Sequence, residues 1–289
     1  MLEGAPLAGG LLLGVAFALG LVVGSFLNVV VHRVPLGESI VHPRSRCPRC
    51  KTPIAARDNV PVLSYLWLRG RCRHCGLAIS WRYPAFELAT GLVFAALAWR
   101  YGPTVETLLW MVFAAALLAV AAIDFDHQII PDEISLGGLV AGLTLLPGLV
   151  WLSGGDAFEA FRGAAFGAAL GGGVLWIVGF AHTRLSVALG RTFDHWPGEG
   201  EALPRPASLD YWTWFPGLGF GDVKLLAMIG AWVGVVGVVQ TILAAAVVGL
   251  AFGLGWAAVR RRFDAPFGFA PAIAIGALLV VLFPGFWLA

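Results

Sequence analysis

Asp124 and Asp222 are the two residues of this sequence best placed to do chemistry. They lie 98 residues apart in a mostly apolar chain, and each stands at the edge of an apolar segment. A single carboxylate at a helix end usually meets only interfacial water, whereas two carboxylates brought together share protons and can hydrolyse a bound substrate. In such a pair one carboxylate acts as base and the other as acid, and the sequence does not assign these roles.

Asp124 belongs to an acidic segment, AAIDFDHQIIPDE, that contains three further acids. Asp124 directly follows an apolar run, so we expect it at the edge of the membrane. Asp126 and His127 are expected to face water. Asp132 and Glu133 stand at the start of the next predicted helix, where carboxylates favour the helix N-terminus, and helix capping is the simpler interpretation for both.

Asp222 directly follows a Gly-Phe-Gly sequence in the segment GLGFGDVKLLAMIGAW. Gly219 and Gly221 have no Cβ, so the backbone can turn sharply there or approach another chain closely. An extended substrate could then lie beside Asp222. The alternative is an ordinary helix start, with Lys224 serving only as a snorkelling interfacial cation or as a charge partner.

All four cysteines form two C-x-x-C pairs, separated by 21 residues: Cys47, Cys50, Cys72 and Cys75. This spacing is close to that of a tetrathiolate zinc ribbon, in which the metal supplies folding energy that a short segment lacks. Two disulfides or a redox pair are the alternatives, and iron is the alternative metal. His74 is expected at the surface or beside the site, because four thiolates already complete it.

The composition predicts an all-α polytopic membrane protein. Hydrophobic residues make up 59% of the 289 residues, charged residues 12%, and the mean hydropathy is +0.83. The first apolar stretch lacks the basic start and the cleavage site of a signal peptide, so we interpret it as a retained helix. About eight transmembrane helices are predicted, at residues 7–31, 84–100, 105–123, 134–152, 160–182, 223–236, 238–259 and 268–288.

The distribution of charge predicts the orientation of these helices. Ten of the 19 Lys and Arg residues lie between Arg33 and Arg82, against two acids. The positive-inside rule places this loop in the cytoplasm and the N-terminus outside. Alternation then puts the basic triplet at 260–262 in the cytoplasm and both candidate aspartates at the same edge of the membrane.

A second polar segment, about residues 183–220, is predicted as a long cytoplasmic loop. It is rich in proline and ends in the aromatic residues Tyr211, Trp212, Trp214 and Phe215. The aromatic end is typical of an interfacial belt that leads into the next helix, and contact with a substrate is the alternative. We assign no role to the remainder.

The motifs together resemble one family over nearly the whole chain, the bacterial type IV prepilin peptidases. These are membrane aspartic proteases with a G-x-G-D motif. Four segments carry the resemblance: GSFLNVVVHRVP at 24–35, the stretch from Asn59 to Gly91, IDFDHQIIPDEIS at 123–135 and GFGDVKLLAMIGAW at 219–232.

The resemblance implies that Asp124 and Asp222 are the catalytic pair and that the four cysteines bind structural zinc. It further implies cleavage of the basic leader of type IV prepilins or type II secretion pseudopilins, then N-methylation of the new N-terminus with S-adenosylmethionine. The site of the methyl donor is not assigned, although the Cys-rich loop is where the resemblance would put it. The implied location is the bacterial inner membrane, with the lipid bilayer and the pilin substrates as partners and no nucleic acid.

The predicted organisation is a first transmembrane helix at 1–31, a cytoplasmic zinc-binding domain at 32–83 and a transmembrane protease domain at 84–289. Two other functions fit the same residues. One is a non-catalytic, zinc-bearing assembly protein of a pilus or secretion apparatus, in which both aspartates only cap helices. The other is an intramembrane aspartic protease without methyl transfer.

Overall fold

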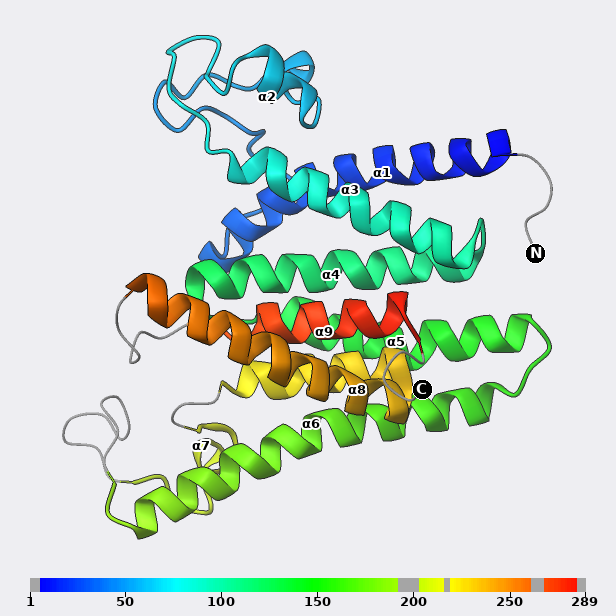
Figure 1. Cartoon of the computed structure of the whole chain (residues 1–289). Helices are drawn as coiled ribbons and strands as arrows, with labels where there is room; N and C mark the ends of the chain where they lie inside the picture. Colours follow the sequence, from blue (N-terminus) through cyan, green and yellow to red (C-terminus); the bar gives the residue numbers. More distant parts are fainter. Residues whose placement is uncertain (1–5, 192–202, 216–218, 261–267, 285–289) are drawn as a thin grey trace. The chain divides into compact units, whose positions relative to one another are not determined.

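The chain is all-helical over the residues that the computed structural model describes, which are 6–191, 203–215, 219–260 and 268–284. Two isolated β-bridges are the only other regular pairing in these ranges. The all-α prediction is therefore confirmed for them. The chain divides into two compact units, Met1–His127 and Gln128–Ala289, and each is described by itself (Figure 1).

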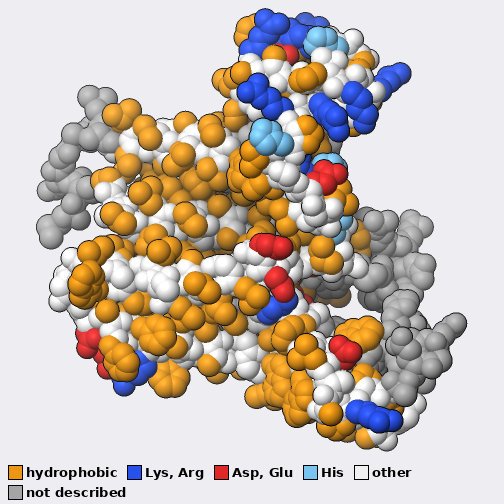
Figure 2. All heavy atoms as spheres, turned by 180° about the vertical axis from the view of Figure 1, so that it is seen from behind, with side chains coloured by type: hydrophobic (Ala, Val, Ile, Leu, Met, Phe, Trp, Pro, Cys, Tyr) orange, Lys and Arg blue, Asp and Glu red, His pale blue; other side chains and the backbone are white. Residues whose placement is uncertain are grey.

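The first unit consists of three long helices and a small insert between the first two of them. Its elements are α1 (Pro6–Arg33), η1 (Val34–Leu36), η2 (Ala56–Asp58), α2 (Leu63–Trp67), α3 (Arg82–Tyr101) and α4 (Val105–His127). α1 packs on both α3 and α4. Figure 2 shows that Lys and Arg side chains gather on the insert, whereas apolar side chains dominate the surface of the long helices.

Glycines bring α1 close to α3. A Cβ on Gly20 would lie 2.7 Å from the Cα of Gly91, and a Cβ on Gly24 would lie 2.8 Å from the Cα of Glu87. Lipid chains are as apolar as leucine, so close packing of small residues is what draws membrane helices together. These glycines therefore account for the α1–α3 contact.

The insert is attached to α3 by one buried carboxylate. Glu87 is 8% exposed, and its Oε2 accepts a hydrogen bond of 2.7 Å from the backbone N–H of Val62. Val62 has a φ of 60°, which a β-branched residue rarely adopts. The hydrogen bond to Glu87 stabilises this unusual backbone at the start of α2.

The second unit is built around α8. Its elements are α5 (Asp132–Leu152), α6 (Ala157–Ala188), α7 (Leu209–Thr213), α8 (Phe220–Arg260) and α9 (Ala270–Leu282). α8 packs on α5, α6 and α9. α6 begins with an N-cap, because the Asp156 carboxylate accepts hydrogen bonds from the backbone N–H groups of Phe158 and Glu159.

α8 is two helices joined at Gly234. This residue has a φ of 70° and a ψ of −173°, a conformation open essentially only to glycine. Figure 1 shows that the halves before and after the break run in nearly opposite directions. The 41 residues of α8 would extend about 60 Å as one straight helix, twice the ~30 Å hydrocarbon core of a bilayer. The break therefore divides α8 into two shorter helices.

Within the part of the chain that the structure describes, five helices are long and apolar enough to cross a membrane: α1, α4, α5, α6 and α8. The predicted spans at 223–236 and 238–259 correspond to the two halves of α8, with the break at Gly234 rather than at residue 237. α6 continues to Ala188, six residues past the predicted end of its span. The total of eight spans and the predicted domain boundaries stay predictions.

The contact between α6 and α8 is made through backbone atoms. Gly167 of α6 and Gly230 of α8 face each other so closely that a Cβ on either would overlap the carbonyl oxygen of the other. Gly171 meets the carbonyl oxygen of Leu226 in the same way. These glycines set the position of the first half of α8, which carries Asp222.

We expect Gly167→Leu to lower the free energy of unfolding of the second unit by about 1–3 kcal/mol or more, because a side chain at this position must force two backbones apart. Gly163→Leu is the matched control, since a Cβ there meets nothing within 4 Å. Thermal unfolding of the purified variants in detergent measures the difference. Equal melting temperatures for the two variants would contradict the proposed role of the glycine contact.

We expect Glu87→Ala to loosen the insert, because it leaves the Val62 N–H without its acceptor at a cost of about 1–3 kcal/mol. Glu87→Gln keeps an acceptor oxygen and should lose less. Hydrogen exchange at the amide of Val62 and limited proteolysis of the insert report the effect. If exchange at Val62 were unchanged in the alanine variant, Glu87 would not be the attachment point.

Candidate active site and metal centre

Asp124 lies on the buried face of α4. Phe113, Leu117 and Val120 precede it at helical spacings of four, three and four, and all three are at most 1% exposed. Asp124 continues this row and is 5% exposed. Carboxylates are rarely buried, and those within membrane helices usually mark functional sites.

Asp126 and His127 are exposed, as predicted. The carboxylate of Asp126 accepts hydrogen bonds of 2.8 and 2.9 Å from the guanidinium of Arg82, in the first turn of α3. The same guanidinium lies over the ring of Phe125, 5.8 Å from its centroid. Asp126 therefore has a structural partner within its own unit.

Asp222 lies in the first turn of α8 and is half-buried. Its backbone N–H donates a hydrogen bond of 3.0 Å to the carbonyl oxygen of Gly219. A Cβ on Gly221 would lie 3.0 Å from the Cβ of Ile130, so the chain passes close to the start of α5 there. The missing side chain of Gly221 thus makes room for Ile130.

Lys224 is a charge partner, the second of the two alternatives that its sequence position left open. Its ammonium forms an ion pair with Asp132, in the first turn of α5. α5 begins at Asp132, and Pro131 occupies its N-cap position without a side-chain cap. Asp132 and Glu133 therefore lie inside the first turn rather than at the cap itself, where they still interact favourably with the helix dipole. The ion pair joins the starts of α5 and α8.

The two candidate aspartates are carried by different units. Asp124 ends the buried row of α4 in the first unit, and Asp222 opens α8 in the second. Each lies near an acid that already has a cationic partner, Asp126 with Arg82 and Asp132 with Lys224. The ion pairs thus identify structural partners for Asp126 and Asp132.

The four cysteines form one cluster. The Sγ atoms of Cys47, Cys50, Cys72 and Cys75 all lie within 4.8 Å of one another, and those of Cys47 and Cys75 are 3.6 Å apart. All four are free thiols, so the disulfide alternative does not describe this structure. His74 is exposed and outside the cluster. Four converging sulfur atoms could hold one metal ion.

Two similar turns present these sulfur atoms. In the first, Cys47 donates its backbone N–H to Thr52 and accepts from the N–H of Lys51. In the second, Cys72 donates to Leu77 and accepts from Gly76. Each turn is closed by an isolated β-bridge, Arg46 with Pro53 and Arg71 with Ala78. Because the hydrogen bonds repeat in both turns, the two thiols of each C-x-x-C pair are held in a similar arrangement.

The thiols of the cluster differ in acidity. Hydrogen bonds from the side chain and backbone of Thr52 lower the pKa of Cys50 to about 6. A backbone hydrogen bond at Leu77 acts to lower the pKa of Cys75, but desolvation and the three neighbouring thiols raise it to about 11. Four close thiols cannot all ionise without a compensating cation, which a bound metal supplies.

The ion pair of Asp58 and Arg73 stabilises the loop between the two turns. Arg73 donates to both carboxylate oxygens, at distances between 2.5 and 3.1 Å. Asp58 is 9% exposed, and its hydrogen bonds from Arg73 lower the pKa of the carboxyl group. This contact fixes η2 against the second turn.

Sequence reasoning missed an aromatic cluster that folds part of the predicted loop onto α6. The ring of Trp212 stacks on Trp176 and Phe180, and the Trp176 indole N–H donates to the carbonyl oxygen of Trp212. Arg184 stacks on the ring of Tyr211 and donates to its carbonyl oxygen. The spacing of four between 176, 180 and 184 was the signal, since it places all three on one face of α6.

Two family profiles match most of the chain. Residues 18–101 match the bacterial peptidase A24 N-terminal domain, and residues 111–254 match the type IV leader peptidase family. The first match contains the cysteine cluster, and the second contains both candidate aspartates. No solved structure matches the chain.

Several curated relatives are named prepilin leader peptidase/N-methyltransferase. The protein of Burkholderia pseudomallei strain 1026b is 37% identical over 96% of this chain and 88% of its own length. The protein of Myxococcus xanthus is 41% identical over 90% of this chain and 70% of its own length. The protein of Neisseria gonorrhoeae is 32% identical over 92% of this chain and 88% of its own length. These matches, together with the motifs found in the two units, show that the chain belongs to the type IV leader peptidase family.

Proposed function

We propose that this protein is a membrane aspartic endopeptidase that removes the leader peptide of type IV prepilins or type II secretion pseudopilins, with Asp124 and Asp222 as its catalytic pair. The observation that carries the proposal is the position of Asp124. It continues the buried row of Phe113, Leu117 and Val120 on α4 and is 5% exposed, which is rare for a carboxylate. Family membership supplies the substrate class.

In the proposed reaction, one aspartate is ionised and takes a proton from the attacking water. The other is protonated and donates to the oxygen of the scissile carbonyl, so the peptide bond is broken without a covalent intermediate. Close carboxylates divide their protons in this way, because two like charges in one site cannot both ionise easily. The glycines before Asp222 have no side chain, so an extended peptide could lie close to the backbone there.

The proposed second activity is methylation of the new N-terminus with S-adenosylmethionine. The names of the relatives support it. No residue is assigned to the methyl donor. Residues 192–202 and residues 216–218, next to the G-x-G-D motif, lie outside the described residues.

We propose zinc as the metal of the cysteine cluster. Tetrahedral zinc–thiolate bonds of about 2.3 Å place neighbouring sulfur atoms about 3.8 Å apart. The 3.6 Å between Cys47 and Cys75 fits this spacing. The metal would be structural, because four protein ligands leave no open position for a substrate.

The proposed location is the bacterial inner membrane, with the N-terminus outside. The zinc site and the catalytic aspartates then face the cytoplasm. The density of arginines in the insert and its near lack of acids support this orientation by the positive-inside rule.

We expect Asp124→Asn and Asp222→Asn each to abolish leader cleavage, because neither variant can complete the proton transfer. Asp126→Asn is the matched control and should cleave normally, since it loses only an exposed ion pair worth at most about 1 kcal/mol. Processing of a co-expressed prepilin on a gel measures all three. Normal processing by both Asp124 and Asp222 variants would instead favour the non-catalytic assembly protein.

Mass analysis of the mature pilin tests the second activity. We expect the new N-terminus to carry one added methyl group when S-adenosylmethionine is present. An unmethylated terminus after complete cleavage would remove the transferase activity and leave a protease alone.

We expect one zinc ion per chain, and none in Cys72→Ser, because three thiolates lose most of the affinity of four. Elemental analysis of the purified protein measures the metal and distinguishes zinc from iron. Chelation should make the insert sensitive to proteases while the long helices stay protected. If the insert were equally resistant with and without metal, the cluster would not stabilise it.

A further inference from the structure

The insert carries a surplus of positive charge that leader cleavage does not explain. Ten of the 19 Lys and Arg residues lie between Arg33 and Arg82. Of the two acids in this segment, Asp58 is already paired with Arg73. A basic leader peptide gains nothing from such a surface, whereas an anionic ligand is attracted to it.

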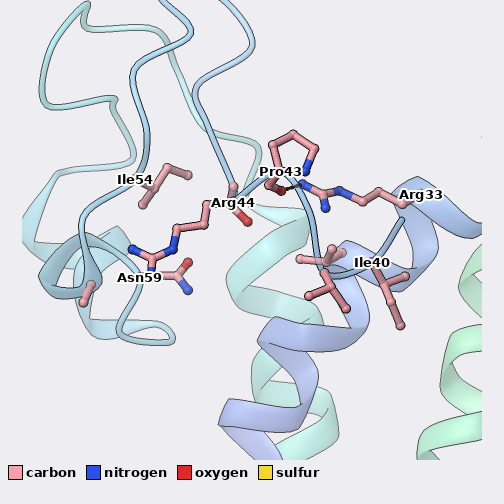
Figure 3. Close-up of a pocket in the computed structure, with 10 residues that line it drawn as sticks. Arg33, Ile40, Pro43, Arg44, Ile54 and Asn59 are labelled. Atoms are coloured by element: carbon pink, nitrogen blue, oxygen red, sulfur yellow. Dashed lines mark hydrogen bonds between the residues drawn. The ribbon is translucent and has the colours of Figure 1, made fainter. Parts of the chain in front are cut away.

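A cavity of about 360 Å³ lies where the end of α1 meets the insert (Figure 3). Arg33 and Arg44 contribute guanidinium groups to its wall, and Ser45 and Asn59 contribute uncharged polar groups. The rest of the wall is mostly aliphatic and comes from Val29, Ile40, Val41, Pro43, Ile54 and Ala56. This combination suits an amphiphile with an anionic end.

The two arginines have different surroundings. Arg33 donates to the carbonyl oxygens of Ser39 and Pro43, at 2.8 and 2.7 Å, and so holds one side of the cavity together. Arg44 extends toward Asn59 (Figure 3) and has no ion pair or hydrogen bond within the described parts of the chain. Its donors are available for a ligand, with the charge of Arg33 nearby.

The apolar wall of the cavity continues along α1. Val29 and Arg33 extend a row of exposed apolar residues that recur at helical spacings of three and four: Leu11, Val15, Leu19, Val22 and Phe26. Val22 lies 11 residues before Arg33, a rise of about 17 Å. One leaflet of hydrocarbon is about 15 Å thick, so this part of the row matches one acyl chain.

We propose that this cavity binds the headgroup of an anionic phospholipid, with an acyl chain lying along the exposed row of α1. The phosphate is bound by Arg44 and Asn59 and attracted by Arg33. A free phosphate compound would not need an aliphatic wall that continues into the membrane-facing surface. A second helix would not fit a cavity of this size.

The test uses the full chain, purified in a neutral detergent and offered equal amounts of phosphatidylglycerol and phosphatidylcholine. Native mass spectrometry counts the lipid that each variant retains. We expect the wild type to retain phosphatidylglycerol preferentially and Arg44→Gln to retain roughly fivefold less of it. Arg49→Gln, which removes the same charge from an exposed site away from the cavity, should bind like the wild type.

A second measurement follows folding directly. Phosphatidylglycerol should raise the melting temperature of the wild type and of Arg49→Gln by more than that of Arg44→Gln. Arg33→Gln is not used, because Arg33 also holds the wall of the cavity.

Three results would overturn the proposal. One is equal retention of the two lipids by the wild type. Another is an equal loss of bound phosphatidylglycerol in Arg44→Gln and Arg49→Gln, which would indicate a general effect of charge. The third is displacement of the lipid by an excess of inorganic phosphate or glycerophosphoglycerol, which would assign the cavity to a soluble phosphate compound. None of these results bears on leader cleavage.

Discussion

The close approach of backbones at glycine is the constraint on which the rest of this structure depends. In a bilayer, burial of apolar side chains does not drive helices together, so contact requires that two backbones come near enough for dispersion forces to act. The chain meets this condition at Gly20 and Gly24 in the first unit and at Gly167 and Gly230, among others, in the second. α8 is thereby fixed on α6, and the turn that carries Asp222 is fixed with it.

Charged groups are few in this chain, and several of the described ones form ion pairs. Arg82 pairs with Asp126, Lys224 with Asp132, and Arg73 with Asp58. Ion pairs at partly exposed positions contribute little free energy, but each fixes the register of two chain segments. Asp124 and Asp222 are proposed for catalysis on a different ground, because both lie in the segment that matches the type IV leader peptidase family.

Much of the fold could be predicted from the sequence, because long apolar runs and two C-x-x-C pairs are strong local signals. The break at Gly234 was less visible in the sequence. Glycines stand at 230, 234, 237 and 249, so the sequence leaves the position of the break open, and only tertiary packing determines which glycine takes the non-helical conformation. The aromatic cluster on α6 required knowledge that Trp212 folds back across 36 residues to Trp176. The role of Lys224 was likewise undecidable, because its partner Asp132 is 92 residues away.

The hydrogen bond between Glu87 and Val62 also bears on the order in which the protein is made. A ribosome synthesises α1 first, then the insert with its cysteines, and Glu87 only afterwards with α3. The backbone of the insert at Val62 therefore reaches its final conformation only after α3 has packed on α1. The final conformation of the insert at the start of α2 is in this way tied to the packing of α3 on α1 through a single carboxylate.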